Sequence, residues 1–249
     1  MAVDFQSLYV LASGLYFQNR KLETVANNLA NVNTTGFKKD FLSALAEPVP
    51  PSDTTPDITE SRPFTSAQNF VYPVMGEREI DLSQGALIKT DNPLDVAIEG
   101  KGFFTIEVNG KIFYTRDGHF EIDKNGYLVN QNGYKVLGKN GLIKIGRKAI
   151  SQLKIAKDGS IYVGSKKIAQ LRVVALKNLR KVGENLFSGV PTITNNYSII
   201  QGFLEGSNVN PVREMVELIK TTRIYQSYAN AIKSIDEDNS KLINGILRA

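Results

Sequence analysis

The chain has no cysteine among its 249 residues. Disulfide bonds, thiol chemistry and zinc–thiolate sites are therefore excluded. The absence suits a chain that crosses an oxidising space, because no thiols can be mispaired there. Histidine is almost as scarce: His119 is the single one. It has no second histidine or cysteine to complete a familiar metal site, and we expect it to be a partly exposed strand residue.

Long apolar runs are also missing. No stretch approaches the ~18 or more consecutive apolar residues that suggest a membrane-spanning helix. The first residues, MAVDFQSLYVLASGLYF, contain only a short apolar run, and Asp4 stands where a signal peptide carries positive charge. The same residues continue as an amphipathic helical pattern. We therefore expect no cleaved signal peptide, and export, if it occurs, by a route that reads another feature.

Motifs of catalysis are absent as well. The sequence has no G-x-S-x-G and no H-E-x-x-H, and EGKGFF at 99–104 lacks the spacing of a phosphate-binding loop. The acidic residues at 99, 107, 121 and 123 fit the solvated face of alternating strands. We expect no enzyme activity, no catalytic residue, no cofactor, no metal site and no small-molecule substrate.

The charge balance does not point to one class of function. The net charge is +5, and Lys and Arg are spread from Arg20 to Arg248 without a compact basic block. A nucleic-acid groove is therefore not expected. Hydrophobic residues make up 42% and charged residues 22% of the chain, which excludes a disordered or fibrous protein.

The sequence does contain a helical pattern near its N-terminus. Apolar residues recur at alternating steps of three and four from Leu8 to Val32, which is typical of a coiled-coil seam. Only Gln18 interrupts the pattern. We expect this helix to end near Asn33, with Gly36 as the flexible stop.

A second helix is predicted at the other end. Asn210 predicts its N-cap and Pro211 its first helical position, and the same three-four alternation follows. One apolar face can meet the N-terminal helix, and a second, early in the helix, is left for another partner. The predicted assembly seam of the two helices is Leu8, Leu11, Leu15, Leu22, Val25, Leu29, Leu218, Tyr225, Tyr228, Ile232, Ile235, Leu242 and Ile246. The second apolar face is Val212, Met215, Val216 and Ile219.

Between the helices the apolar period changes to two. Short strands in this region are cut by Asn-Gly and Asp-Gly pairs, which favour two-residue hairpin turns. The pairs are Asn109-Gly110, Asp117-Gly118, Asn125-Gly126 and Asn132-Gly133. Further strands are predicted at 142–145, 152–156, 160–163, 167–176 and 197–204.

These patterns predict an α+β fold in which discontinuous N- and C-terminal helices form a coiled-coil domain with an inserted antiparallel β-rich domain. The helical domain comprises 1–42 with 205–249, and the β-rich domain comprises 80–204. Residues 43–79 form an extended crossing linker, because 46–75 is rich in proline. A lone two-helix coil of this length is marginal in water, so the topology favours an assembly.

Three segments resemble bacterial flagellar rod and hook subunits. LYVLASGLYFQNRKLETVANNLANVNTTGFKKD is similar to the N-terminal signature of that family. NPLDVAIEGKGFF and YTRDGHFEIDKNGYLV resemble its central β segment, and LEGSNVNPVREMVELIKTTRIYQSYANAIKSID resembles its C-terminal helix signature. Together they cover most of the chain in the order that the family has.

The resemblance implies a structural subunit of the basal body that spans the periplasm as part of a hollow rod and transmits torque. It implies terminal helices in the inner tube, β-domains in the outer wall, and export by the flagellar type III apparatus without a cleaved signal. The implied partners are other copies of the chain, other rod subunits and the export apparatus. The length of the chain and the shortness of 46–75 favour a proximal-rod type, with a distal-rod type as the alternative.

Two other classes stay open. A soluble adaptor that binds one partner through its terminal helices predicts a stable monomer with ordered ends. A rod subunit predicts instead that protease cuts both termini first. A hydrolase acting on the cell wall would need a pair of carboxylates in a cleft.

The cluster of asparagines at the end of the first helix calls for an explanation, because asparagine is a poor helix former. With Leu22 and Leu29 at heptad position a, the asparagines within the helix flank or oppose the seam. In a packed tube they could donate and accept hydrogen bonds without a charge to desolvate. The predicted subunit-contact residues are Asn27, Asn28, Asn31, Asn33, Gly36 and Phe37.

Overall fold

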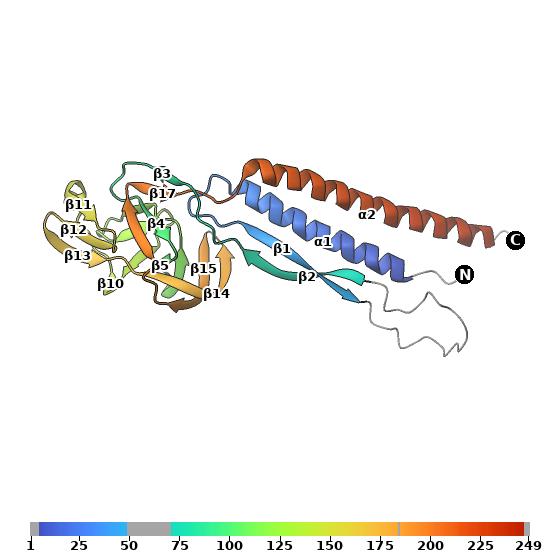
Figure 1. The fold of residues 1–249 in the computed structure, drawn as a ribbon, viewed down its shortest axis with the longest axis horizontal. Helices are drawn as coiled ribbons and strands as arrows, with labels where there is room; N and C mark the ends of the chain where they lie inside the picture. The colour runs from blue at the N-terminus through green and yellow to red at the C-terminus, as the bar shows by residue number, and fades with distance from the viewer. Residues whose placement is uncertain (1–4, 49–70, 184, 247–249) are drawn as a thin grey trace. The chain divides into compact units, whose positions relative to one another are not determined.

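A computed structural model describes residues 5–48, 71–183 and 185–246 (Figure 1). The chain forms two compact units. The first, which we call the terminal unit, comprises residues 1–30, 40–81 and 210–249; the second, the β unit, comprises 31–39 and 82–209. The α+β fold with helices at both ends and strands between them is confirmed. The domain boundaries given above stay a prediction.

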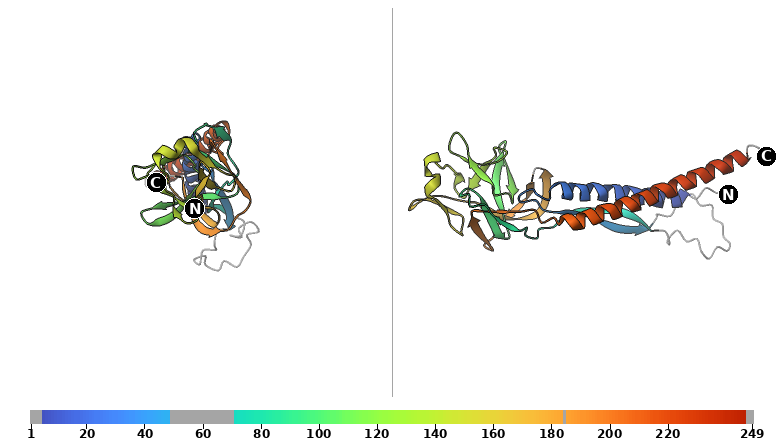
Figure 2. Two further views of the ribbon diagram at one scale, coloured as in Figure 1. Left: turned by 90° about the vertical axis from the view of Figure 1, so that its left-hand side faces the viewer. Right: turned by 90° about the horizontal axis from the view of Figure 1, so that it is seen from above.

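The terminal unit contains two helices and a two-stranded ribbon. Its elements are α1 (Phe5–Ala30), β1 (Asp40–Pro48), β2 (Val71–Ile80) and α2 (Pro211–Ile246). The two helices run side by side in opposite directions, and α1 also packs against the ribbon (Figures 1 and 2).

The ends of both helices follow from local chemistry. The side chain of Asn210 accepts a hydrogen bond from the backbone N–H of Arg213 at 3.1 Å, and α2 begins at Pro211, so the predicted cap is confirmed. The first helix ends at Ala30, three residues before Asn33. A turn follows it, and Gly36 adopts a φ of +67°.

Part of the predicted linker forms strands. β1 and β2 pair antiparallel, from Asp40 opposite Ile80 to Pro48 opposite Val71. Residues 49–70, which include most of the prolines of the predicted crossing segment, lie outside the described residues.

The β unit contains four antiparallel sheets. The largest has the strand order β14-β15-β6-β5-β9-β8-β7, with β10 paired to β9; the smaller ones are β11-β12-β13, β16-β4 and β17-β3. The strands are β3 (Leu87–Lys89), β4 (Val96–Gly100), β5 (Phe103–Val108), β6 (Lys111–Thr115), β7 (Phe120–Ile122), β8 (Leu128–Asn130), β9 (Lys135–Gly138), β10 (Gly141–Leu142), β11 (Leu153–Ile155), β12 (Ser160–Val163), β13 (Lys166–Gln170), β14 (Val173–Gly183), β15 (Leu186–Thr192), β16 (Tyr197–Gln201) and β17 (Phe203–Glu205). A 3₁₀ helix, η2 (Arg147–Gln152), precedes β11.

The predicted strand ranges are partly corrected. The range 167–176 is divided between β13 and β14, and 197–204 is divided by Gly202, whose φ is +77°. Strand β15 was not predicted. The range 142–145 is mostly irregular, although Ile143 and Ile145 are buried in the core.

One of the four predicted two-residue turns is present. Asn109 and Gly110 both have positive φ and join β5 to β6. The turns at 123–127 and 130–134 are longer, because Asp123 and Asn130 each accept two backbone N–H groups with one side-chain oxygen. Gly118 lies instead against a neighbouring backbone: a Cβ there would be 1.7 Å from the carbonyl oxygen of Val96.

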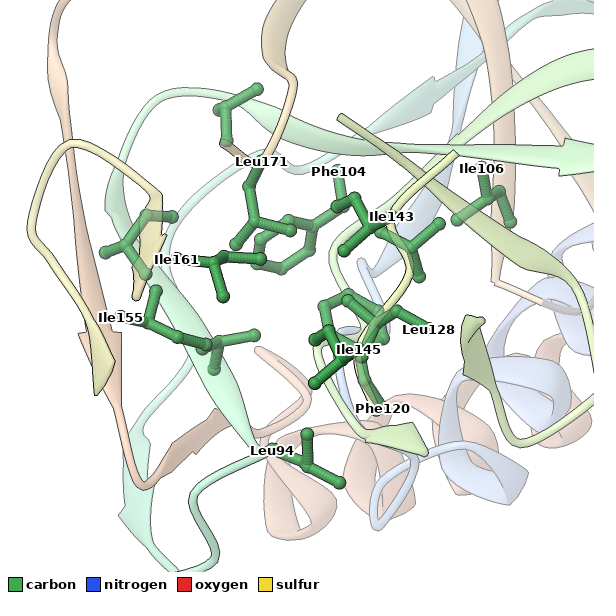
Figure 3. Packing of buried hydrophobic residues seen from close by; sticks show 14 of the residues in the cluster. Leu94, Phe104, Ile106, Phe120, Leu128, Ile143, Ile145, Ile155, Ile161 and Leu171 are labelled. Atoms are coloured by element: carbon green, nitrogen blue, oxygen red, sulfur yellow. The ribbon is translucent and has the colours of Figure 1, made fainter. Parts of the chain in front are cut away.

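The core of the β unit is aliphatic and aromatic (Figure 3). Phe104 and Phe120 contact each other edge to face, with ring centroids 5.2 Å apart. Ile161 and Leu171 come from the β11–β14 half of the unit and belong to the same cluster, so the largest sheet, β11-β12-β13 and β16-β4 contribute to one core. Within the described residues, no helix is long and apolar enough to cross a membrane.

Candidate functional site

The described part of the helix pair contains most of the predicted assembly seam. Among the seam residues whose side chains are described, Val25 is buried and the other ten are half-buried. The side chains of Leu242 and Ile246 lie outside the described residues. The seam as an assembly surface stays a prediction.

The residues buried deepest in α1 are Val25, which belongs to that seam, and four residues that each lie one position before a heptad position. The four are Gly14, Phe17, Thr24 and Asn28. Several of them are small or polar, and a search for apolar periodicity passes over such residues. The leucines flank this buried stripe and keep part of their surface exposed.

The close approach of the two helices explains why residue 14 is a glycine. A Cβ atom at Gly14 would lie 2.7 Å from Cζ of the Tyr228 ring, which is closer than real contacts allow. Glycine therefore makes room for the aromatic ring. Further along the pair, Lys21 forms an ion pair with Glu217.

Asn28 is a buried polar residue whose side chain hydrogen-bonds to two other segments of the terminal unit. Its side-chain amide donates to the backbone carbonyl of Asp40 at 2.7 Å and accepts from the Asp40 N–H at 3.0 Å, so it pairs with that residue as a neighbouring strand would. The amide also donates to Glu214 of α2 at 3.3 Å. The side chain is 1% exposed. It therefore joins α1, the start of β1 and the first turn of α2.

Replacing this amide tests its structural role. Asn28→Ala leaves the buried N–H and C=O of Asp40 without their partner, and we expect a loss of about 2–3 kcal/mol in the unfolding free energy of the terminal unit. Asn27→Ala is the matched control, because Asn27 is exposed on the same turn and the change should cost less than about 0.5 kcal/mol. Urea unfolding followed by circular dichroism measures both, and equal losses would contradict the role given to Asn28.

The other predicted subunit-contact residues divide into exposed and buried ones. Asn27 and Asn33 are exposed, and Asn31 is half-buried, with its side chain accepting from the Thr34 hydroxyl at 3.1 Å. Gly36 and Phe37 are buried inside the β unit. The contact of all these residues with a neighbouring subunit stays a prediction. Asn27 and Asn33 are the most accessible to such a contact, because they are exposed.

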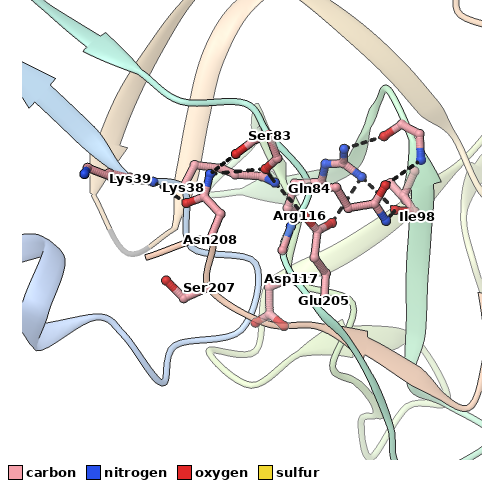
Figure 4. Close-up of polar contacts among 12 residues, drawn as sticks. Lys38, Lys39, Ser83, Gln84, Ile98, Arg116, Asp117, Glu205, Ser207 and Asn208 are labelled. Atoms are coloured by element: carbon pink, nitrogen blue, oxygen red, sulfur yellow. Dashed lines mark hydrogen bonds and ion pairs between the residues drawn. The ribbon is translucent and has the colours of Figure 1, made fainter. Parts of the chain in front are cut away.

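A buried charge cluster, which we call the clasp, lies in the β unit and consists of Lys38, Arg116 and Glu205 (Figure 4). The Lys38 ammonium lies 2.6 Å from Oε1 of Glu205 and donates to the carbonyl of Ser83, also at 2.6 Å. The Arg116 guanidinium lies 3.2 Å from Oε2 of Glu205. These three side chains are between 0% and 4% exposed. One carboxylate thus serves two buried cations.

The surroundings of the clasp fix the arginine. Its guanidinium donates to the carbonyls of Ile98 at 2.9 Å and Gly100 at 2.5 Å and lies 5.6 Å from the centre of the Phe103 ring. Burial lowers the pKa of Arg116, and the charge of Glu205 opposes that shift. Arginine keeps its charge in proteins even so, and Glu205 is therefore needed as its counter-ion.

Backbone hydrogen bonds join the same two segments. Gly36 donates to the carbonyl of Glu205 at 2.7 Å, and Asn208 donates to the carbonyl of Phe37 at 3.3 Å. The Lys39 N–H donates to the Asn208 side chain at 2.7 Å (Figure 4). Residues 36–39 lead directly into β1, and 205–209 lead into α2. The clasp therefore holds together two of the four segments through which the chain passes between the β unit and the terminal unit.

A third contact anchors the segment before the clasp. The Asp117 carboxylate accepts from the Thr35 hydroxyl at 2.9 Å and from the N–H of His119 at 3.1 Å. Burial raises the pKa of Asp117, and these hydrogen bonds oppose the shift.

His119 is partly exposed, as predicted, and its Nδ1 lies 3.3 Å from Asp95. The described residues contain no cluster of three or more metal-ligating side chains.

Sequence comparisons give the family. Three family profiles match the chain: "Flagella basal body rod protein" at residues 8–38, "Flagellar hook protein FlgE/F/G D1 domain" at 97–163 and "Flagellar basal body rod FlgEFG protein C-terminal" at 200–245. The flagellar basal-body rod protein FlgG of Buchnera aphidicola (subsp. Schizaphis graminum) is 34% identical, over 95% of this chain and 98% of its own. FlgF of Caulobacter vibrioides is also 34% identical, over 93% and 94% of the two chains. FlgG of Bacillus subtilis is 33% identical, over 96% and 98%. On this evidence the chain belongs to the bacterial flagellar basal-body rod family and is a structural subunit of the rod.

Proposed function

We propose that this rod subunit assembles through its paired terminal helices into a hollow shaft that transmits torque. The observation that carries the proposal is the incomplete burial of the helix pair. Ten of the predicted seam residues are only half-buried in the single chain. Burying the rest of their apolar surface against further copies would stabilise the helices, which are marginal as an isolated pair.

The first turns of α2 support the same proposal. Four apolar side chains there are between 51% and 68% exposed: Val212, Met215, Val216 and Ile219. Contiguous exposed apolar side chains of this kind mark interaction surfaces. Further along α2 the exposed positions become polar, with Arg223, Gln226 and Asn230. Among the described side chains of α2, the large exposed apolar ones are therefore confined to its first turns.

Replacing apolar residues of these two faces with aspartate tests whether they are needed for assembly. Leu22→Asp with Leu29→Asp should abolish rod formation and swimming, because carboxylates would be buried without partners. Val216→Asp should have the same effect while leaving the chain folded, since its side chain is already 61% exposed. Ile112→Asp, at an exposed position of the β unit, is the control.

Electron microscopy of basal bodies and motility assays measure the result. Circular dichroism of the purified variants establishes that α1 and α2 are still formed. Normal rods and swimming with folded Val216→Asp would contradict the role proposed for the second apolar face, and normal rods with Leu22→Asp and Leu29→Asp would contradict the role of the seam.

Export by the flagellar type III apparatus without a cleaved signal is part of the same proposal. It is supported by the family and by the short, acid-containing apolar run at the N-terminus. The place along the rod stays a prediction. One relative named FlgG and one named FlgF are each 34% identical to this chain, so the proximal-rod assignment is tested by asking whether the chain restores rods to strains lacking FlgF or lacking FlgG.

A further inference from the structure

Charge is divided unequally along this chain. The terminal unit has 10 Lys or Arg and 15 acidic residues, a net charge of −5, whereas the β unit has 20 and 10, a net charge of +10. Nearly all of that excess lies in residues 135–170, which we call the basic module. It contains nine Lys or Arg residues and a single acid, a net charge of +8. The basic residues are spread along the chain, as the sequence indicates, but in this segment nine of the 30 occur with a single acid.

The basic module presents its lysines to solvent. The described side chains of Lys139, Lys144, Lys154, Lys157, Lys166 and Lys167 are exposed. In the sheet β11-β12-β13, Tyr162 is opposite Lys154 on one side and Lys167 on the other. The neighbouring Leu153, Ile155 and Ile161 are buried in the core, so this lysine–tyrosine–lysine row is on the outer face of the sheet.

The only acid of the module, Asp158, interacts electrostatically with Lys167 but leaves the other lysines of the module uncompensated. Asp158 accepts hydrogen bonds from the N–H of Ser160 at 3.0 Å and from its hydroxyl at 2.6 Å, which fixes the turn before β12. No salt bridge within 4 Å joins any described lysine of the module to an acid of the described chain. The positive charge is therefore available to an external partner.

The module lies at one end of the β unit. In Figures 1 and 2, strands β11, β12 and β13 are at the end of that unit farthest from the point where the chain continues towards β1. The clasp holds residues 36–39 and 205–209, which lead into β1 and α2, at the opposite end. A contact at the module therefore leaves these segments uncovered.

We propose that the basic module docks against an acidic face of a second protein, different from this chain. Contact between the modules of neighbouring copies is unfavourable, because each carries a net charge of +8. The proposed assembly brings copies together and increases this repulsion, which an acidic partner would relieve. The inference rests on the proposed function only in this last step.

The choice of lysine favours a protein over a phosphate-bearing surface. Eight of the nine basic residues of the module are lysine. Lysine is a compact, strongly hydrated charge, whereas arginine provides the bidentate geometry that suits phosphate groups. A surface of exposed lysines suits the carboxylates of an acidic protein face and makes a salt-sensitive contact.

Binding of the full-length chain to poly-L-glutamate, used as a probe of acidic protein surfaces, tests the proposal. The double variant Lys154→Glu/Lys167→Glu should bind about tenfold or more weakly than the unchanged chain. Lys101→Glu/Lys111→Glu is the control with the same charge change, because both lysines are exposed in the β unit outside the module. It should bind no more than about threefold more weakly.

Vesicles containing phosphatidylglycerol provide the second arm. Weaker binding to these vesicles than to poly-L-glutamate at 150 mM salt, on the order of physiological ionic strength, supports a protein partner, and tighter binding overturns it in favour of a lipid surface. Equal losses in the two double variants would overturn the assignment to residues 135–170. Because binding is measured on the unassembled chain, a failure here is distinct from a failure of rod assembly.

Discussion

Glu205→Gln should destabilise the β unit by about 3–5 kcal/mol, because it leaves Lys38 and Arg116 as uncompensated buried cations. Glutamine preserves the shape of the side chain and an acceptor for Lys38, so the loss measures the missing charge. The cluster is sensitive because the cations have no access to water: their side chains are 1% and 4% exposed. The expected loss is a large fraction of the stability of an ordinary domain.

Hydrogen–deuterium exchange resolved by peptide is the appropriate measurement, since the two units of the chain need not unfold together. Amides of β4, β5 and β6 should exchange faster in Glu205→Gln, whereas Glu99→Gln, at an exposed position of β4, should leave them unchanged. A second comparison separates the charge from the fold. Lys38→Met/Glu205→Leu should be at least about 1 kcal/mol more stable than Glu205→Leu alone, because one unpaired cation is removed. A double variant no more stable than the single one would contradict the coupling.

The start of α2 could be predicted because its signals are local, whereas α1 ends at Ala30, three residues before the predicted end. Asn210 and Pro211 form a cap from adjacent residues, and neither depends on the rest of the fold. The hairpin at Asn109 and Gly110 is local in the same way, with both residues at positive φ. At 123–127 the competing local signal of Asp123 prevailed over the Asn-Gly pair, because its side chain accepts two backbone N–H groups.

The clasp and the Asn28 contacts could not be predicted, because their partners are distant in sequence. Lys38 and Glu205 are separated by 167 residues, and a lysine in the stretch GFKKD has the pattern of a solvated charge. Asn28 was assigned to a subunit contact because it lies beside the leucine seam. In the structure it is buried and bonded to Asp40 and Glu214 of its own chain. Hydrophobic periodicity locates the side of α1 that packs against the rest of the terminal unit. It does not show that Asn28 is buried on that side, because this depends on its hydrogen bonds to Asp40 and Glu214.

Gly36→Ala should be the most damaging single change in the segment between α1 and β1. Two costs add at this position. Its φ of +67° is unfavourable for any residue with a Cβ, by about 1–2 kcal/mol. A Cβ would also lie 2.4 Å from the backbone nitrogen of Asp117 and 2.6 Å from the carbonyl carbon of Arg116, and overpacking of this kind costs about 1–3 kcal/mol.

Gly110→Ala separates the two costs. Its φ of +77° is similar, but no atom lies within 4 Å of the Cβ it would acquire, so only the backbone cost remains. We expect Gly36→Ala to lower the unfolding free energy of the β unit by about 3–4 kcal/mol and Gly110→Ala by about 1 kcal/mol. Hydrogen exchange of β-unit amides measures both. The backbone at Gly36 is held by its hydrogen bond to Glu205, so movement that relieves the clash would also open the clasp and accelerate exchange at β17. Equal effects of the two substitutions would show that the backbone around Arg116 and Asp117 yields freely, and the close packing of this segment would then contribute nothing to stability.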